Sequence, residues 1–147
     1  MKSEPDVFSI EDLERVKVEP WDGIRNYQAR NFMRDQMRVG DRVLFYHSNC
    51  QPPGVAGLAR IASEPYPDPT AFDEKSHYFD PKSKREAPTW ILVEVAFEER
   101  FECIVSMEEL RAEDSLRDMV ILRKGNRLSI CPVTGAEYDK VVELGRR

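Results

Sequence analysis

The segment from Thr89 to Phe97 most constrains the fold of this chain, because two sets of side chains alternate strictly along it. One set is Ile91, Val93, Val95 and Phe97, and the other is Trp90, Leu92, Glu94 and Ala96. A period of two is the pattern of a β-strand. We therefore predict a strand over 89–97 whose first set faces the core.

Two more strands are expected around the loop NCQPPG. Arg42 to Ser48 and Gly54 to Ala62 are both strand-like, and a pair of strands joined by a loop of this kind predicts a hairpin. The second strand contains Ala56 and Gly57, whose small size permits close approach of backbone or ligand.

Short helices with capping residues are expected before and after these strands. Ser9 with Asp12, Ser106 with Glu109, and Thr134 with Glu137 have the spacing of helix starts, and the last two helices are expected to end near Arg111 and Leu144. Residues 63–88 contain five prolines and predict a long irregular excursion. Residues 127–133 (RLSICPV) follow a turn at 124–126 and predict a short strand. The mixture indicates an α+β domain around a small, strongly bent sheet or barrel, with 1–147 as a single domain.

Composition narrows the classes of function. A chain of 147 residues suits one domain, and a net charge of −5 argues against non-specific coating of nucleic acid. The three cysteines, Cys50, Cys103 and Cys131, form no Cys-x-x-Cys pair, so neither a disulfide framework nor a zinc site is indicated. With no apolar stretch of signal-peptide or membrane length, we expect a soluble intracellular protein, cytoplasmic or, in a eukaryote, nuclear.

The segment WDGIRNYQARNF, residues 21–32, carries the clearest functional pattern. After a turn at Asp22-Gly23, Asn26 is a candidate N-cap of a helix. One face of that helix is apolar, with Ala29, Phe32, Met33 and Met37. The other carries Tyr27, Arg30, Arg34 and Arg38. This second face can bind an anion or can simply be solvated, and the pattern alone leaves both open.

Catalytic patterns are scarce. His47 and Ser48 are neighbours on a predicted strand and point to opposite faces, so they do not form a base and nucleophile pair. The chain has no nucleophile elbow, phosphate-cradling loop or His-Glu-x-x-His pair, and only two histidines. We expect no catalytic residues, no metal and no cofactor.

Planar and hydrogen-bonding side chains are better represented. The set that could read a flipped or unpaired base is Trp21, Asn26, Tyr27, Tyr46, Ser48, Asn49, Trp90, Arg127 and Ser129. Such residues provide ring faces for stacking and polar groups for a base edge. Each of them also has an ordinary structural interpretation, with the aromatic rings as core residues.

An ordered series of motifs resembles one known family over nearly the whole chain. The motifs are MKSEP, WDGIRNYQARNF, FYHSN, PGVAGLARI, EPYPDPTAF, a Tyr-Phe-Asp-Pro stretch, PTWILVEV and RLSICPV. Together they are similar to the EVE domain. This resemblance implies a PUA-like pseudo-barrel flanked by short helices, related to YTH and ASCH domains, that reads modified bases. By motif position it implies a binding role for Lys2, Ser3, Trp21, Asn26, Tyr27, Tyr46, Ser48 and Arg127.

Two positions depart from the family pattern. Family members usually carry Trp-Leu before MKSEP, whereas Met1 opens this chain, so we expect either a shortened first strand or a misplaced start codon. Cys131 stands where the family commonly has Gln, which replaces an amide by a weak donor.

Three hypotheses follow. The first is a module that binds a modified base, a pyrimidine in DNA or RNA, with Arg25, Arg30 and Arg34 on flanking phosphates. The second is an enzyme acting on a modified nucleotide, with water placed beside Glu4 or His47. The third is a protein-interaction adaptor, which predicts no affinity for nucleic acid.

Overall fold

The structure is a computed structural model that describes residues 1–147. It contains two compact units, each assembled from segments distant in sequence. The first unit comprises Met1–Lys17, Arg42–Ala59 and Phe97–Arg147, and the second comprises Val18–Asp41 and Arg60–Ala96. The prediction of a single domain stays a prediction.

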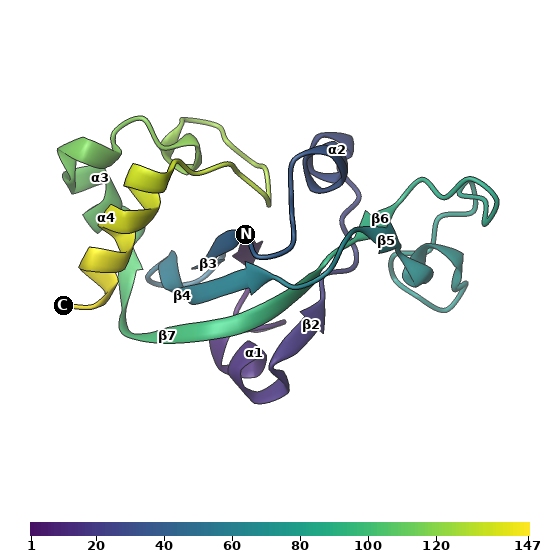
Figure 1. The fold of residues 1–147 in the computed structure, drawn as a ribbon, viewed down its shortest axis with the longest axis horizontal. Coiled ribbons are helices and arrows are strands. Elements are labelled where there is room, and N and C mark those ends of the chain that lie inside the picture. Colours follow the sequence, from purple (N-terminus) through teal and green to yellow (C-terminus); the bar gives the residue numbers. More distant parts are fainter. The chain divides into compact units, whose positions relative to one another are not determined.

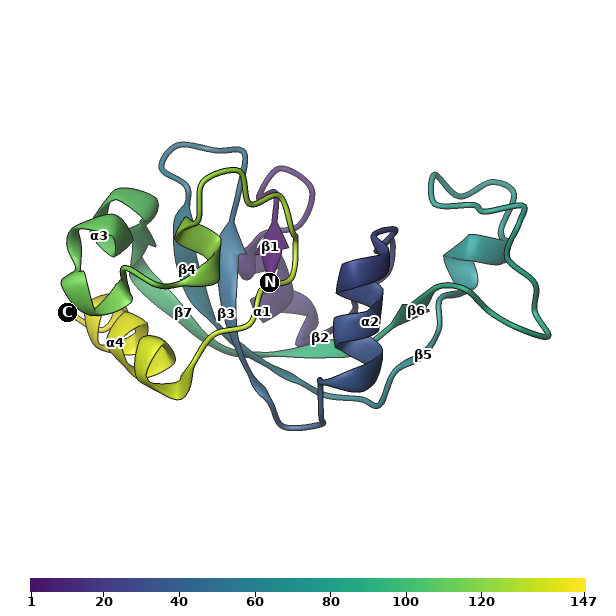
Figure 2. The same ribbon diagram turned by 90° about the horizontal axis from the view of Figure 1, so that it is seen from above.

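The sheet of the first unit has the strand order β1-β3-β4-β7 (Figure 2). Its strands are β1 (Lys2–Ser3), β3 (Arg42–His47), β4 (Gly54–Ile61) and β7 (Glu94–Ser106), of which the last two continue into the second unit. β1 runs parallel to β3, with Lys2 opposite Tyr46 and Ser3 opposite His47. β3 and β4 are neighbours in the sheet, which confirms the expected pairing. β1 is only two residues long.

The helices of the first unit begin where their capping residues predict. They are α1 (Ile10–Val16), α3 (Met107–Ala112) and α4 (Gly135–Gly145), with two short 3₁₀ helices, η2 (Asp114–Leu116) and η3 (Val120–Leu122). Ser9, Ser106 and Thr134 each close a complete capping box. α3 and α4 lie side by side, and α1 covers the opposite face of the sheet (Figures 1 and 2).

Because helices cover both faces of the sheet, β3 is buried after its exposed first residue Arg42, with Val43 to His47 all buried. The core beneath α3 and α4 is one apolar cluster. Its members are Leu44, Tyr46, Val55, Leu58, Phe101, Val105, Leu110, Leu116, Met119, Tyr138 and Val141.

The second unit contains a helix and two pairs of short strands. Its elements are β2 (Val18–Pro20), α2 (Tyr27–Asp35), β5 (Tyr66–Pro67), the 3₁₀ helix η1 (Pro69–Phe72) and β6 (Ile91–Leu92). β2 pairs antiparallel with the first three residues of β7, and β5 pairs antiparallel with β6. α2 begins after the predicted cap Asn26 and buries Ala29 and Met33, which confirms its predicted apolar face.

The predicted strand over 89–97 is wrong in two respects. The chain breaks at Val93 into β6 and β7, and β7 continues to Ser106. The core set is also different, since Leu92 and Ala96 are buried while Ile91 and Phe97 are only half-buried. Burial on both faces explains the error, because alternation identifies a core face only when the other face meets water.

The strand predicted over 127–133 does not form. This segment is irregular, with bends at Ser129 and Ile130, and it pairs only through the Lys2 amide, which donates to the Ser129 carbonyl at 2.8 Å. Pro132 also lacks a backbone donor. The excursion over 63–88 is largely irregular as predicted, apart from β5, η1 and a bridge between Lys84 and Ala87.

Mixed parallel and antiparallel strands with short helices confirm the α+β class. None of the helices is both long and apolar enough to span a membrane.

Candidate nucleic-acid interface

A buried carboxylate organises the turn that precedes α2 in the second unit. Asp68 is fully buried and accepts four hydrogen bonds. Two come from Thr70, through its backbone N–H at 2.9 Å and its hydroxyl at 2.6 Å, and the others come from the Gly23 N–H at 2.9 Å and the Arg25 guanidinium at 3.0 Å. Burial raises the pKa of Asp68, but these hydrogen bonds outweigh burial and leave the pKa below its ordinary value.

Arg25 is held within the same turn. Besides Asp68, its guanidinium donates to the Tyr78 carbonyl at 2.7 Å and 3.1 Å and to the Thr70 hydroxyl at 3.2 Å. It also lies 5.4 Å from the ring centroid of Trp90. The phosphate-binding role expected of Arg25 stays a prediction, and its hydrogen bonds give it a structural role in joining residues 22–26 to the excursion.

Gly23 is required by this arrangement. Its φ of +81° is in the left-handed region, and a Cβ built on it would lie 2.6 Å from the Tyr78 ring. The glycine thus lets the ring close over the turn.

The aromatic cluster of the second unit consists of Tyr27, Trp90 and Arg30. Trp90 is buried, and its indole N–H donates to Asp80 at 2.7 Å. Tyr27 is 60% exposed, with its ring centroid 4.9 Å from that of Trp90 and the planes at 37°. The Arg30 guanidinium lies 4.8 Å from the Tyr27 centroid and donates to the Thr89 carbonyl at 3.0 Å. The cluster therefore presents an accessible ring beside a cation.

The remaining predicted residues of this unit have local partners. The Asn26 side chain accepts from the Ala29 N–H at 3.0 Å as the helix cap. Trp21 is buried, and its backbone N–H donates to the Val93 carbonyl at 2.8 Å. Arg34 pairs with Asp35 at 2.8 Å on an exposed surface.

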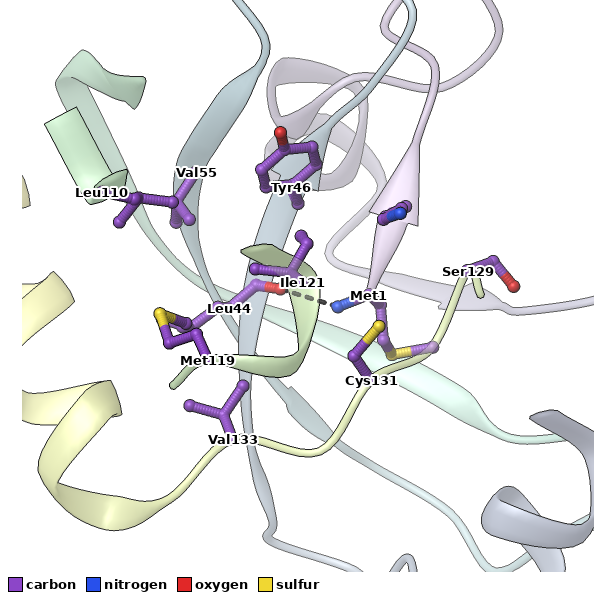
Figure 3. Close-up of a pocket in the computed structure, with 11 residues that line it drawn as sticks. Met1, Leu44, Tyr46, Val55, Leu110, Met119, Ile121, Ser129, Cys131 and Val133 are labelled. Atoms are coloured by element: carbon purple, nitrogen blue, oxygen red, sulfur yellow. Dashed lines mark hydrogen bonds between the residues drawn. The ribbon is translucent and has the colours of Figure 1, made fainter. Parts of the chain in front are cut away.

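The first unit contains a small apolar cavity beside β1 and β3 (Figure 3). Its volume is about 30 Å³, which suits a water-sized group. The lining residues are Met1, Lys2, Leu44, Tyr46, Val55, Leu110, Met119, Ile121, Ser129, Cys131 and Val133. The predicted residues Lys2, Tyr46 and Ser129 are thus brought together, and this cavity alone is smaller than a nucleobase.

Several predicted residues of the first unit leave polar groups without a protein partner. The side chains of Lys2, Ser48, Asn49, Arg127 and Ser129 make no hydrogen bond or ion pair, and none of their polar atoms is buried. These groups are available to a ligand.

Ser3 and Tyr46 differ from that set. The Ser3 hydroxyl donates to the Phe8 carbonyl at 2.6 Å, so it is already used within the chain. Tyr46 is 4% exposed, and burial raises the pKa of its hydroxyl. Its ring packs in the core, as the structural interpretation of the sequence allowed.

His47 has a structural partner as well. Its Nε2 accepts from the backbone N–H of Ile10 at 3.1 Å, at the start of α1, and burial lowers its pKa. Both observations favour a neutral imidazole whose Nε2 already accepts a hydrogen bond within the chain.

The space expected beside Gly57 is filled. A Cβ built on this residue would lie 2.3 Å from the Glu99 carbonyl oxygen and 2.9 Å from the Ile10 side chain. Its small size therefore permits close approach of neighbouring backbone and not of a ligand.

Sequence reasoning missed Asp68, Asp80 and Asn126 as organising residues. Asp68-Pro69-Thr70 did contain a usable signal, because an Asp followed by Pro is a common start of a helical turn, and Asp68 caps η1. Asp80 gave no local signal, since its partner Trp90 is ten residues away.

Comparison with known proteins identifies the family. The EVE domain model matches residues 1–144. The chain belongs to the EVE domain family. Thymocyte nuclear protein 1 of Danio rerio is 42% identical over 163 residues, covering 98% of this chain and 70% of that protein.

Solved EVE domain structures share the fold. A protein from Pseudomonas syringae superimposes with a TM-score of 0.93 at 44% identity, covering 98% of this chain and 96% of that one. Human THYN1, solved in complex with DNA containing 5-methylcytosine, gives a TM-score of 0.91 at 40% identity and covers 100% of this chain and 96% of its own. These matches confirm the predicted EVE, PUA-like fold.

Proposed function

We propose that this chain is a nucleic-acid-binding module that recognises a modified pyrimidine, 5-methylcytosine or a close analogue, in DNA. The observation that carries the proposal is the DNA complex of human THYN1, whose solved chain matches this chain over 100% of this chain's residues. A relative of this identity shares the fold, and binding of the same class of ligand is the simplest expectation for this chain.

The aromatic cluster of the second unit supports the proposal. Tyr27 offers an exposed ring face, and Trp90 beneath it and Arg30 beside it restrict that ring. A restrained ring loses little conformational entropy when a base stacks on it, and the neighbouring cation favours a polyanion. We propose that Tyr27 stacks on a base and that Arg30 and Arg34 contact phosphates.

Taken by themselves, the unpartnered polar groups of the first unit can form hydrogen bonds to a base edge. Ser48, Asn49 and Ser129 carry both donors and acceptors, which suits the mixed edge of a cytosine. We propose that these groups, with Lys2 and Arg127, contribute to recognition.

The test is fluorescence anisotropy with a panel of labelled oligonucleotides. Duplex and single-stranded DNA, and RNA, each carry cytosine, 5-methylcytosine or 5-hydroxymethylcytosine at one position, and salt is varied. The proposal predicts that one modified DNA binds at least about tenfold more tightly than its unmodified counterpart at every salt concentration. Equal affinity for all of them would mean that the chain binds only through attraction to phosphates and does not recognise the modified base.

A matched pair of variants tests the stacking role. Tyr27→Ala removes the exposed ring and should weaken binding by about 5- to 150-fold, because stacking contributes about 1–3 kcal/mol per base. Tyr27→Phe keeps the ring and should bind like the wild type. If the two variants bind equally well, Tyr27 does not stack on a base.

We propose in addition that the chain binds without catalysing a reaction. In support, His47 already accepts a hydrogen bond from Ile10 and is kept neutral by burial. Incubation with modified nucleosides and oligonucleotides, followed by mass spectrometry, is expected to return them unchanged. Product formation that Glu4→Gln or His47→Ala abolishes would refute this proposal.

A further inference from the structure

Unpaired cations gather at one turn of the first unit. The basic turn, residues 123–127, has the sequence Arg-Lys-Gly-Asn-Arg and contains no acidic residue. Arg123, Lys124 and Arg127 are all exposed, and none of them forms an ion pair. Several other cations of this unit pair with carboxylates, namely Arg15, Arg42, Arg100, Lys140, Arg146 and Arg147. Lys2, Lys17, Arg111 and Arg117 form no ion pair, but they stand apart from one another in the sequence. In a chain of net charge −5, the basic turn is therefore a local positive surface.

The basic turn has a defined conformation. The Asn126 N–H donates to the Arg123 carbonyl at 3.1 Å, and Gly125 has a φ of +78°. The Asn126 side chain connects the turn to the residues that follow it. Its oxygen accepts from the Leu128 N–H at 3.2 Å, and its amide donates to the Cys131 sulfur at 3.2 Å. The cations therefore extend from a restrained backbone.

The segment after the turn lies against β1. The Lys2 amide donates to the Ser129 carbonyl at 2.8 Å, and Ser129 and Cys131 border the cavity next to Met1 (Figure 3). The basic turn is thus followed closely in the chain by Ser129, whose carbonyl accepts from the Lys2 amide, and both Ser129 and Lys2 are proposed to contribute to base recognition.

We propose that the basic turn binds backbone phosphates beside the recognised base, with Arg123 and Lys124 as contacts and Asn126 as a positioning residue. This inference rests on the proposed function. Three cations within five residues match closely spaced phosphates, whereas an acidic protein partner would gain nothing from the neighbouring base-reading groups.

The experiment measures the salt dependence of binding to the 5-methylcytosine duplex for three proteins: the wild type, Arg123→Gln/Lys124→Gln and Arg15→Gln/Arg100→Gln. The last variant makes the same change in net charge elsewhere in the unit, with Arg15 on α1 across the sheet (Figure 2). Circular dichroism melts check that all three fold.

The plot of log K against log salt should fall less steeply for the basic-turn variant, with a slope about 1.8 smaller in magnitude, which corresponds to two lost phosphate contacts. Its preference for the methylated duplex over the unmodified one should stay unchanged, and the control should keep the wild-type slope. A wild-type slope in the basic-turn variant, or an equal drop in both variants, would overturn the inference while duplex binding stands. No binding by the wild type at low salt would instead overturn the proposed function, and this inference with it.

Discussion

Replacing Asp68 by Asn tests the reasoning about the buried carboxylate. The two Asp68 oxygens each face two donors, Gly23 and Arg25 on one side and the two groups of Thr70 on the other. An amide has one oxygen, so either rotamer turns an NH₂ toward a backbone N–H and leaves that donor without an acceptor. The Arg25 charge also loses its counter-ion.

The expected cost follows from the burial of the pair. Removing one partner of a buried ion pair costs about 3–5 kcal/mol. The Asp68 side chain is inaccessible while that of Arg25 is 22% exposed, so we expect about 3 kcal/mol, the lower end of that range. For a chain of this length this is a fall in Tm of about 10 °C.

Urea unfolding followed by circular dichroism measures the difference, with Asp73→Asn as the matched control. Asp73 is exposed and its carboxylate accepts only from the Lys75 N–H at 3.0 Å, so replacing the carboxylate should cost about 1 kcal/mol or less. Because the pKa of Asp68 is low in the folded chain, its contribution is present above its ordinary pKa of 3.8 and is lost as the pH falls further. If Asp68→Asn costs no more than Asp73→Asn, the buried network does not organise the turn.

Two further predictions concern the first unit. Burial lowers the pKa of His47 below 6.5, so the neutral residue stabilises the fold above that pH and less as the pH falls. Urea unfolding between pH 7 and 5 should therefore show a slope of at most about 1.4 kcal/mol per pH unit that His47→Gln removes, whereas an unchanged slope would assign it to other groups. Gly57→Ala should destabilise by about 2 kcal/mol or more, because its Cβ would meet the Glu99 carbonyl, while Gly135→Ala has open space and should be nearly neutral. Equal thermal shifts for the two glycine variants would contradict this account.

Local signals in the sequence predicted local structure well. The capping boxes at Ser9, Ser106 and Thr134 placed three helices correctly, because a cap bonds to a residue only three positions away. Long-range partners were not predictable in this way. Asp68 and Arg25 are 43 positions apart, and no sequence pattern near either residue indicates that they pair.

Strand patterns were less reliable for a physical reason. β3 is buried on both faces, and in β7 the exposed Cys103 lies between the buried Phe101 and Val105, so neither strand follows simple alternation along its length. For the site, the sequence supplied the residue types, but it did not distinguish the buried rings of Trp21 and Tyr46 from the exposed ring of Tyr27. That distinction depends on packing, which composition and spacing do not encode.

The most direct test of the central claim is the ratio of dissociation constants for one duplex with and without a single 5-methylcytosine. Anisotropy titrations at 0.15 M salt and again at 0.5 M salt would give this ratio for the wild-type chain. A pocket that reads the modified base predicts a ratio of at least about ten that persists as salt weakens both complexes, since phosphate contacts are common to the two duplexes. A ratio of one at both salt concentrations, with binding that disappears on adding salt, would contradict recognition of a modified base.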